Sequence, residues 1–251
     1  MPDALDLRLL LTEQGVAPLD EDNVPRLDDP KVQLGRALFF DKALSGGQDI
    51  ACADCHHPVF GTSDGLPTSI GVGGEGLGPD RALHGDHAVI PRNAPDLFNR
   101  GSKIWETMFW DARVAEFDGY IESPAGTSLP AGLDSVLAAQ ALFPPTSADE
   151  MRGHPGANEI ADIDNSNVTE IWTALTERIL SYSEYVAMFA EAYPETPLND
   201  ITFAHAANAL AAFEISAFTK TDSPFGRFLK GNDYAMSDQA MRGAALFYGE
   251  A

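Results

Sequence analysis

The sequence predicts a mainly α-helical protein with long ordered loops and little or no β structure. Apolar residues recur at spacings of three and four in several segments, which is typical of helices with one buried face. No segment of convincing length alternates between apolar and polar residues, as a half-buried strand would. Residues 57–103 are rich in glycine and proline and have little periodicity, which predicts a long ordered loop. A loop of this length inside a compact domain often wraps a ligand.

Three of the predicted helices have a recognisable start or end. The helical patterns cover residues 29–40, 133–141, 168–193, 200–218 and 237–248. The first begins at Asp29-Pro30, because proline is well tolerated in the first turn of a helix. Pro194 and Pro197 end the third, which has the clearest apolar stripe. Ser237 is a good N-cap for the last.

Composition and charge exclude several classes of protein. The 251 residues include 16 basic and 38 acidic side chains, for a net charge of −22. This charge argues against general affinity for nucleic acid or for an anionic membrane. No segment reaches the roughly 18 apolar residues that cross a bilayer. The acidic N-terminus shows no signal peptide, and two cysteines exclude a disulfide-dense scaffold.

The two cysteines lie in the motif Cys52-Ala53-Asp54-Cys55-His56, which is the attachment signature of haem c. Two thiols three residues apart can bond to the two vinyl groups on one porphyrin edge. The following histidine, His56, is then held under the iron as its proximal ligand. Because haem c is assembled in an oxidising compartment, the motif favours the bacterial periplasm or cell envelope.

Three other interpretations of the motif stay open. A Cys52–Cys55 disulfide would be typical of a thioredoxin-like redox motif, but no βαβ pattern surrounds it. A zinc site needs two further ligands, and the adjacent His56 and His57 are poorly spaced to reach one ion together. Chance occurrence of the motif is the third. Haem attachment is the preferred interpretation.

Short motifs follow one another in order from about residue 30 to the C-terminus: Leu34-Gly35-Arg36-Ala37-Leu38-Phe39-Phe40-Asp41, Ser69-Ile70-Gly71, Pro91-Arg92-Asn93-Ala94-Pro95, Phe109-Trp110-Asp111-Ala112-Arg113, Glu150-Met151, Asp222-Ser223-Pro224-Phe225 and Arg242-Gly243-Ala244-Ala245-Leu246-Phe247. Their order resembles the N-terminal portion of bacterial di-haem cytochrome c peroxidases. This superfamily includes the di-haem enzyme that matures methylamine dehydrogenase. The resemblance implies a cytochrome c-like haem domain over residues 1–220 and the start of a second, truncated one over residues 221–251.

The resemblance also implies an activity and its partners. The N-terminal haem of such enzymes reduces hydrogen peroxide to water, and a second haem, expected beyond this chain, collects the electrons. The expected donor is a small protein such as a cytochrome c or a cupredoxin, and a second copy of the chain could form a homodimer.

The resemblance implies roles for individual side chains. Glu150 matches the catalytic acid–base glutamate, with Glu122 or Glu159 as alternative counterparts. Trp110 matches the tryptophan that relays electrons between the haems. Asn93 matches a residue that the family uses for a calcium ion.

One departure from the family concerns the second axial position of the iron. After the Ser-Ile-Gly triplet, peroxidases of this family have a distal histidine ligand, and Val72 stands there in this sequence. Valine cannot bind iron. Either the distal position is open, or His84 or His87 from the same loop replaces the missing ligand.

Two further functional hypotheses stay open beside peroxide reduction. A haem enzyme of the same family could oxidise a protein or organic partner. A mono-haem electron-transfer cytochrome would instead have two protein ligands on its iron. The missing distal histidine favours the enzymes over the carrier.

Overall fold

The computed structural model describes residues 3–250, which form two compact units. The larger unit spans Pro25–Thr219, and the smaller one combines the N-terminal segment up to Val24 with the C-terminal segment from Lys220. The sequence-based division into 1–220 and 221–251 differs from this at the N-terminal end. The N-terminal segment belongs to the smaller unit because Leu7 and Leu11 pack with Phe228 there.

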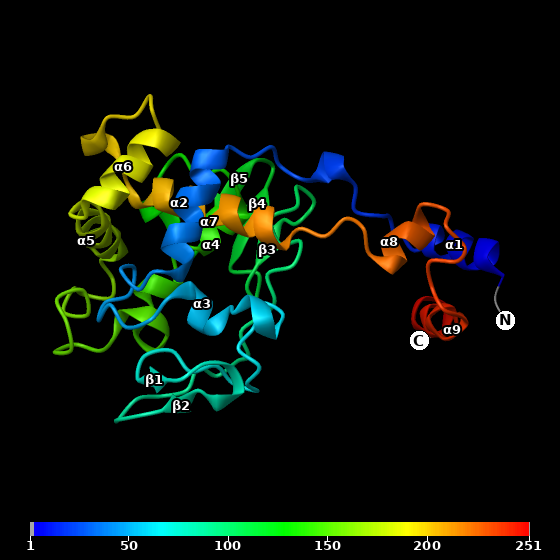
Figure 1. The fold of residues 1–251 in the computed structure, drawn as a ribbon, viewed down its shortest axis with the longest axis horizontal. Coiled ribbons are helices and arrows are strands. Elements are labelled where there is room, and N and C mark those ends of the chain that lie inside the picture. Colours follow the sequence, from blue (N-terminus) through cyan, green and yellow to red (C-terminus); the bar gives the residue numbers. More distant parts are fainter. Residues whose placement is uncertain (1–2, 251) are drawn as a thin grey trace. The chain divides into compact units, whose positions relative to one another are not determined.

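The core of the larger unit is the crossing of helices α2 (Asp29–Phe40) and α7 (Phe203–Phe218), which lie side by side (Figure 1). Gly35 of α2 permits this close approach, because a Cβ atom there would lie 1.7 Å from the carbonyl oxygen of Ala209. The helix α7 is buried along most of its length, with alanine on several faces. A helix that is apolar all round belongs in the centre of a domain.

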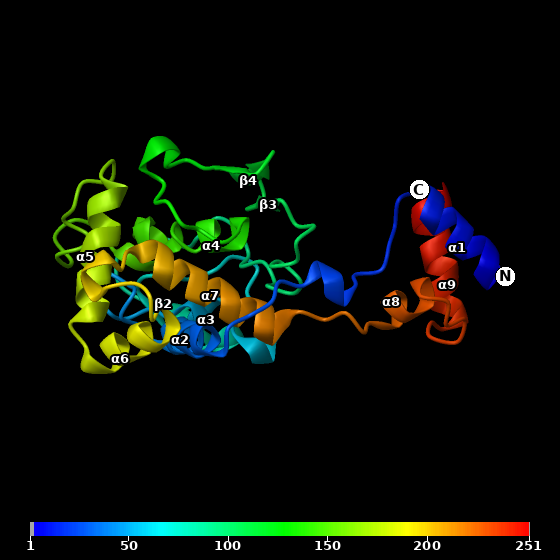
Figure 2. The ribbon, with the colours of Figure 1, turned by 90° about the horizontal axis from the view of Figure 1, so that it is seen from above.

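Three further helices surround this pair, namely α4 (Val136–Gln140), α5 (Val168–Leu180) and α6 (Ser183–Ala192) (Figure 2). The prediction of one continuous helix over 168–193 is wrong. The chain leaves the helical conformation at Tyr182, which has an extended backbone with φ −92° and ψ 123°. The apolar stripe continues across this break, so periodicity alone could not reveal it.

The long loop is ordered and contains little regular structure, so the mainly α prediction is confirmed. A single helical turn, α3 (Cys52–Cys55), precedes it. Two small antiparallel sheets contain the strands β1 (Gly74–Glu75) and β2 (Ala82–Leu83), and β3 (Thr107–Met108), β4 (Val114–Phe117) and β5 (Tyr120–Glu122).

The smaller unit contains the helices α1 (Ala4–Glu13), α8 (Pro224–Leu229) and α9 (Asp238–Ala245). As predicted, Ser237 caps α9, since its hydroxyl accepts a hydrogen bond from the backbone N–H of Ala240 at 3.2 Å. No helix within residues 3–250 is long and apolar enough to cross a membrane.

We expect Gly35→Ala to lower the free energy of unfolding by about 3 kcal/mol, because the added methyl group must push α2 and α7 apart. The measurement is denaturant unfolding followed by circular dichroism. Gly243→Ala in α9 is the matched control: no neighbouring atom lies within 4 Å of the added Cβ, so alanine should stabilise by about 0.5–1 kcal/mol. Equal midpoints for Gly35→Ala and the parent protein would contradict the close packing.

Candidate functional site

The cysteine motif forms one turn of helix that exposes neither thiol fully. The side chain of Asp54 accepts a hydrogen bond of 2.8 Å from the backbone N–H of Ala51 and thereby caps the turn. Both thiols are free and half-buried, and the sulfur of Cys55 lies 3.7 Å from the carbonyl oxygen of Ile70. The turn therefore presents two thiols that can bond to one partner group.

The surroundings of the two thiols disfavour redox or zinc chemistry. Burial raises the pKa of Cys52 to about 12, and the neighbouring charge of Glu214 adds to this effect. Burial also raises the pKa of Cys55 to about 12, with Arg81 opposing the shift. Redox-active cysteines and zinc ligands act as thiolates, which a lowered pKa favours. Both thiols are instead kept protonated at neutral pH.

His56 is oriented through one ring nitrogen. Its Nδ1 lies 3.0 Å from the carbonyl oxygen of Thr62, and a histidine that donates from Nδ1 binds a metal through Nε2. Burial lowers the pKa of His56, which favours the neutral imidazole that a metal requires. Thr62 is itself fixed, because its hydroxyl accepts a hydrogen bond of 2.7 Å from the backbone N–H of Leu97.

Arg81 joins the motif to the long loop, and the sequence analysis missed it. Its guanidinium donates to the carbonyl oxygens of Ile70 at 2.8 Å, Gly71 at 3.1 Å and Gly76 at 3.0 Å. Its Nη1 also lies 3.9 Å from a carboxylate oxygen of Asp54 in α3. Arg81 is only 5% exposed, so it stabilises the loop from the inside. The available signal was an arginine close to the glycine-rich run Gly71–Gly78.

Glu150 lies in a π-helical turn, Ala148–Arg152, that packs directly on the loop. A Cβ atom on Gly71 would lie 2.4 Å from the carbonyl oxygen of Glu150, and the backbone N–H of Val72 donates to Asp149 at 3.0 Å. Burial raises the pKa of the half-buried Glu150, against the opposing charge of Arg113. The charge of Glu150 in turn raises the pKa of Cys55.

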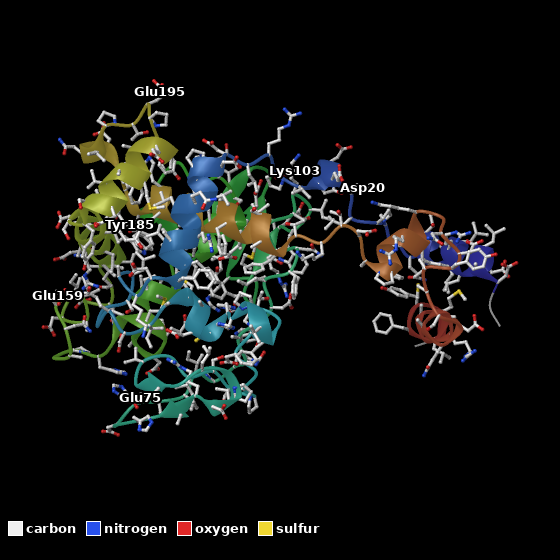
Figure 3. All side chains as sticks on the ribbon, viewed as in Figure 1. Asp20, Glu75, Lys103, Glu159, Tyr185 and Glu195 are labelled. Atoms are coloured by element: carbon white, nitrogen blue, oxygen red, sulfur yellow. The ribbon has the colours of Figure 1, made fainter. Side chains whose placement is uncertain are left out.

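The two alternative glutamates lie in a different environment. The side chain of Glu159 is 71% exposed and forms an ion pair with Arg178 at 2.6 Å (Figure 3). Glu122 is exposed at the end of β5. Of the three candidates, Glu150 is the one whose charge reaches a cysteine of the motif.

The structure distinguishes between the two histidines considered as distal ligands. The side chain of His84 is 56% exposed, and its Nε2 lies 3.8 Å from the carboxylate of Glu75. The Nδ1 of His87 is buried and has no partner among the described residues. The His87 ring packs on Gly73, next to Val72. Of the two, His87 is the one with a buried ring nitrogen that has no partner among the described residues.

Trp110 and Asn93 both lie at the surface of the larger unit. Trp110 is 69% exposed, and the guanidinium of Arg92 stacks 3.7 Å from its ring centroid. The amide nitrogen of Asn93 donates to the carbonyl oxygen of Leu66. Within residues 3–250, no group of three or more His, Cys, Asp or Glu side chains could hold a metal ion.

The residues of the motif fit a haem c, and several buried polar atoms of the larger unit have no partner among the described residues. Such atoms occur in the described residues on Asp64, His87, Arg152 and Glu214. Each carries a free-energy cost unless another group satisfies it. Asp64 and Glu214 act electrostatically on the motif itself, since Asp64 raises the pKa of both Cys55 and His56. Two thiols and an oriented imidazole match a covalently bound porphyrin.

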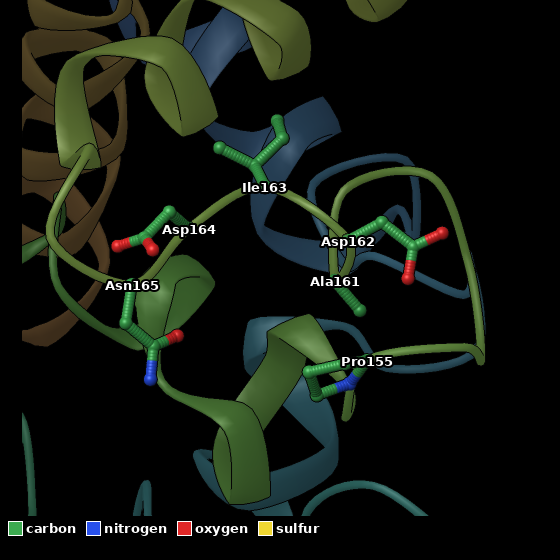
Figure 4. Close-up of a pocket in the computed structure, with 6 residues that line it drawn as sticks. All are labelled: Pro155, Ala161, Asp162, Ile163, Asp164 and Asn165. Carbon is green, nitrogen blue, oxygen red and sulfur yellow. The ribbon is translucent and has the colours of Figure 1, made fainter.

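An open pocket in the loop after the π-helical turn contains none of the predicted site residues (Figure 4). Its lining residues are Pro155, Ala161, Asp162, Ile163, Asp164 and Asn165. Asp162 and Asp164 accept hydrogen bonds from the backbone N–H groups of Gly156 and Ser166, so they shape the loop itself. The chemistry therefore centres on the motif, and not on this pocket.

The helical fold and the C-x-x-C-H turn define a haem-binding domain of the cytochrome c type. The family described as di-haem cytochrome c peroxidase matches residues 29–234. The chain belongs to this family.

Three curated relatives cover most of this chain. The methylamine utilization protein MauG of Methylorubrum extorquens is 32% identical over 90% of this chain and 48% of its own length. The cytochrome c peroxidase Ccp of Escherichia coli is 30% identical over 88% of this chain and 35% of its own length. The cytochrome c551 peroxidase of Pseudomonas aeruginosa is 29% identical over 88% of this chain and 48% of its own length. The chain thus spans about half or less of the length of these relatives.

A solved structure supports the same relationship. A MauG-like protein associated with microbial copper homeostasis superposes with a TM-score of 0.58 and 26% identity, covering 93% of this chain and 52% of the other. The diheme peroxidase BthA of Burkholderia thailandensis, as its Y463M variant, has a TM-score of 0.50 at 22% identity and supports the fold.

We expect both thiols of the folded, haem-free chain to react very slowly with iodoacetamide at neutral pH. A pKa of about 12 instead of 9.0 leaves about a thousandfold less thiolate. The rate should rise with pH until the thiols ionise and should rise sharply on denaturation. Mass spectrometry after timed quenching gives the rate for each cysteine. Fast labelling of the folded chain at pH 7 would contradict the burial and restore the redox-pair interpretation.

Proposed function

We propose that this chain is the peroxidatic haem domain of a bacterial di-haem enzyme that reduces hydrogen peroxide to water. The observation that carries the proposal is that Glu150, a half-buried carboxyl group with a raised pKa, lies on the turn that packs against Gly71 of the long loop, and that its charge raises the pKa of Cys55. The family membership and the peroxidases among the relatives support it.

The proposed chemistry divides the work between the haem and the chain. When bound, the haem would supply electrons and an open iron position for peroxide. Cys52 and Cys55 would attach it, and Nε2 of His56 would hold the iron. Val72 cannot bind the iron. Glu150 would accept a proton from one peroxide oxygen and return it to the other, so that each molecule takes two electrons and two further protons and leaves as two waters.

The remaining parts of the proposal concern electron supply and location. The donor would be a small protein such as a cytochrome c or cupredoxin, acting through a second haem outside this chain. The exposed ring of Trp110 would relay electrons toward this domain. Asn93 would bind calcium together with ligands from outside the chain. We place the protein in the periplasm or cell envelope, where a homodimer could form.

A second candidate function is the oxidation of a protein or organic partner by the same haem. It is favoured by the 32% identity to the methylamine utilization protein MauG. Mixing the haem-loaded protein with peroxide separates the two functions. Rapid consumption of peroxide with a reduced cytochrome donor supports the peroxidase, and a long-lived oxidised species with little turnover supports the alternative.

We expect Glu150→Gln to lower peroxide turnover by the haem-loaded protein by about a hundredfold or more, because the amide cannot exchange the proton. Steady-state peroxide consumption with reduced donor measures the effect. Glu159→Gln is the matched control, since its carboxylate is exposed and paired with Arg178. It should leave turnover unchanged. An unaltered rate for Glu150→Gln would remove this residue from the reaction.

The pH dependence of turnover has a defined sign. A raised pKa for Glu150 means that its base form is lost at a higher pH than for an ordinary glutamate. Turnover should therefore fall as the pH drops through this raised pKa. A profile that stays flat down to the pKa of a free glutamic acid would contradict the buried acid–base role.

We expect the oxidised, haem-loaded protein to show a high-spin ferric signal in electron paramagnetic resonance, because Val72 leaves the distal position without a ligand. Val72→His should convert this signal to low spin, and His87→Ala should leave it unchanged. If the parent protein is purely low spin and becomes high spin in His87→Ala, the distal ligand is His87, and the open-site proposal is wrong.

A further inference from the structure

Thr62 is a buried residue in a backbone conformation that its side chain disfavours, and the proposed reaction assigns it no role. Its φ angle is +61°, in the left-handed region, and only 1% of the residue is exposed. A β-branched residue is rare in this region, because its γ atoms crowd the backbone there. Such a conformation persists only where surrounding contacts hold it, and conformations of this kind gather at functional sites.

Hydrogen bonds hold Thr62 from two sides. On one side, its backbone N–H donates to the carbonyl oxygen of His57 at 3.1 Å. On the other side, its hydroxyl accepts from the backbone N–H of Leu97 at 2.7 Å and donates to the carbonyl oxygen of Gly61 at 2.6 Å. Thr62 is thus fixed between the turn that follows the haem-attachment motif and the end of the long loop's Pro91–Leu97 segment.

The next residue, Ser63, repeats this arrangement. The backbone N–H of His57 donates to the carbonyl oxygen of Ser63 at 3.1 Å. The hydroxyl of Ser63 donates to the carbonyl oxygen of Ala94 at 2.8 Å. Two successive hydroxyl groups therefore tie the segment after the motif to the same part of the long loop.

The held backbone places the carbonyl oxygen of Thr62 at 3.0 Å from Nδ1 of His56. The direction of a carbonyl group follows from the backbone angles of its own residue, so another conformation of Thr62 would aim this oxygen elsewhere. An imidazole that donates from Nδ1 has Nε2 free for a metal, and the hydrogen bond makes the ring a stronger electron donor. The disfavoured conformation thus acts directly on the ring of His56.

We propose that Thr62 is a positioning residue for His56, and that its hydroxyl sets the strength of the bond from His56 to the haem iron. The proposal rests on the attachment of haem at the motif and on His56 as its axial ligand. The hydroxyl holds the backbone, the backbone aims the carbonyl oxygen, and the carbonyl oxygen fixes the imidazole. Hydrogen bonds to an axial ligand are one means by which a protein tunes its haem.

The expected effect is on the reduction potential. A hydrogen bond from Nδ1 leaves more electron density on Nε2. Ferric iron carries one positive charge more than ferrous iron, so it gains more from this density. The hydrogen bond therefore favours the oxidised haem and lowers its potential, which suits a haem that gives electrons to an oxidant.

The test is potentiometric titration of the haem-loaded protein and of Thr62→Val. Valine keeps the branched shape and removes the hydroxyl, so the backbone loses its contact with the N–H of Leu97. We expect the equilibrium constant for one-electron reduction of the haem to rise by about tenfold, which is about 59 mV in midpoint potential.

Two further variants separate positioning from a general loss of packing. Thr62→Ser keeps a hydroxyl that can accept from Leu97, so it should keep the parent potential. Thr176→Val is the matched control, because Thr176 in α5 is 5% exposed and its hydroxyl donates to the carbonyl oxygen of Trp172 at 2.8 Å. It also loses a buried hydroxyl and should leave the potential unchanged.

Two outcomes overturn the proposal. A potential in Thr62→Val equal to that of the parent shows that the hydroxyl serves the fold alone. A shift of the same size in Thr62→Ser shows that the hydroxyl is not the group responsible.

Nuclear magnetic resonance covers the case in which Thr62→Val fails to fold or to bind haem. In the haem-loaded parent protein and in Thr62→Ser, the Nδ1 proton of His56 should exchange slowly with deuterated water, because its acceptor is buried and held on both sides. Rapid exchange in the parent protein also overturns the proposal.

These results are distinguishable from failure of the proposed function. The potential and the proton exchange are measured without peroxide, so an inactive protein with the expected shift in Thr62→Val would retain this proposal and remove the peroxidase. A pyridine haemochrome spectrum without a c-type band would overturn both. A c-type band with equal potentials would overturn the role of Thr62 alone.

Discussion

The site depends on close backbone contacts between the π-helical turn Ala148–Arg152 and two separate loops. The N–H of Gly46 donates to the carbonyl oxygen of Met151 at 2.8 Å, and the N–H of Val72 donates to Asp149 at 3.0 Å. Gly46 and Gly71 have no room for a side chain there, because an added Cβ atom would lie 1.8 Å from the carbonyl oxygen of Arg152 and 2.2 Å from that of Asp149, respectively. Arg178 supports the first loop by donating to the carbonyl oxygens of Ala43, Ser45 and Gly46. Through these contacts, residues about a hundred positions apart form one site.

Local chemistry explains which features the sequence revealed. The spacing of Cys52, Cys55 and His56 has one dominant chemical meaning, and the helix boundaries at Asp29 and Ser237 follow from capping rules that act within a few residues. The break at Tyr182 was missed because both helices keep the same apolar stripe. Whether the helix breaks at Tyr182 depends on packing between helices, and a periodic pattern does not encode that packing.

The residues of the candidate site also differ in whether a sequence pattern could reveal them. Arg81 acts through backbone carbonyl oxygens of its own loop, and Oε2 of Glu214 has no partner among the described residues, so no side-chain pattern in the sequence singles them out. Glu150 was reachable only through its likeness to a family motif, since the chain contains 38 acidic residues and most are solvated. What separates it from Glu122 and Glu159 is burial, and burial is a property of the folded chain.

The smaller unit is formed by an N-terminal and a C-terminal segment, and this has a consequence for the order of folding. Its core joins Leu7 and Leu11, near the start of the chain, to Phe228, so the whole segment Pro25–Thr219 is enclosed between its two halves. The larger unit has a core of its own and can form while α1 still has no partner, and its folding brings the two halves of the smaller unit within reach. Joining the two halves across an unfolded segment would cost conformational entropy that grows slowly with the length of the segment. Once Pro25–Thr219 has folded, most of that entropy has already been lost.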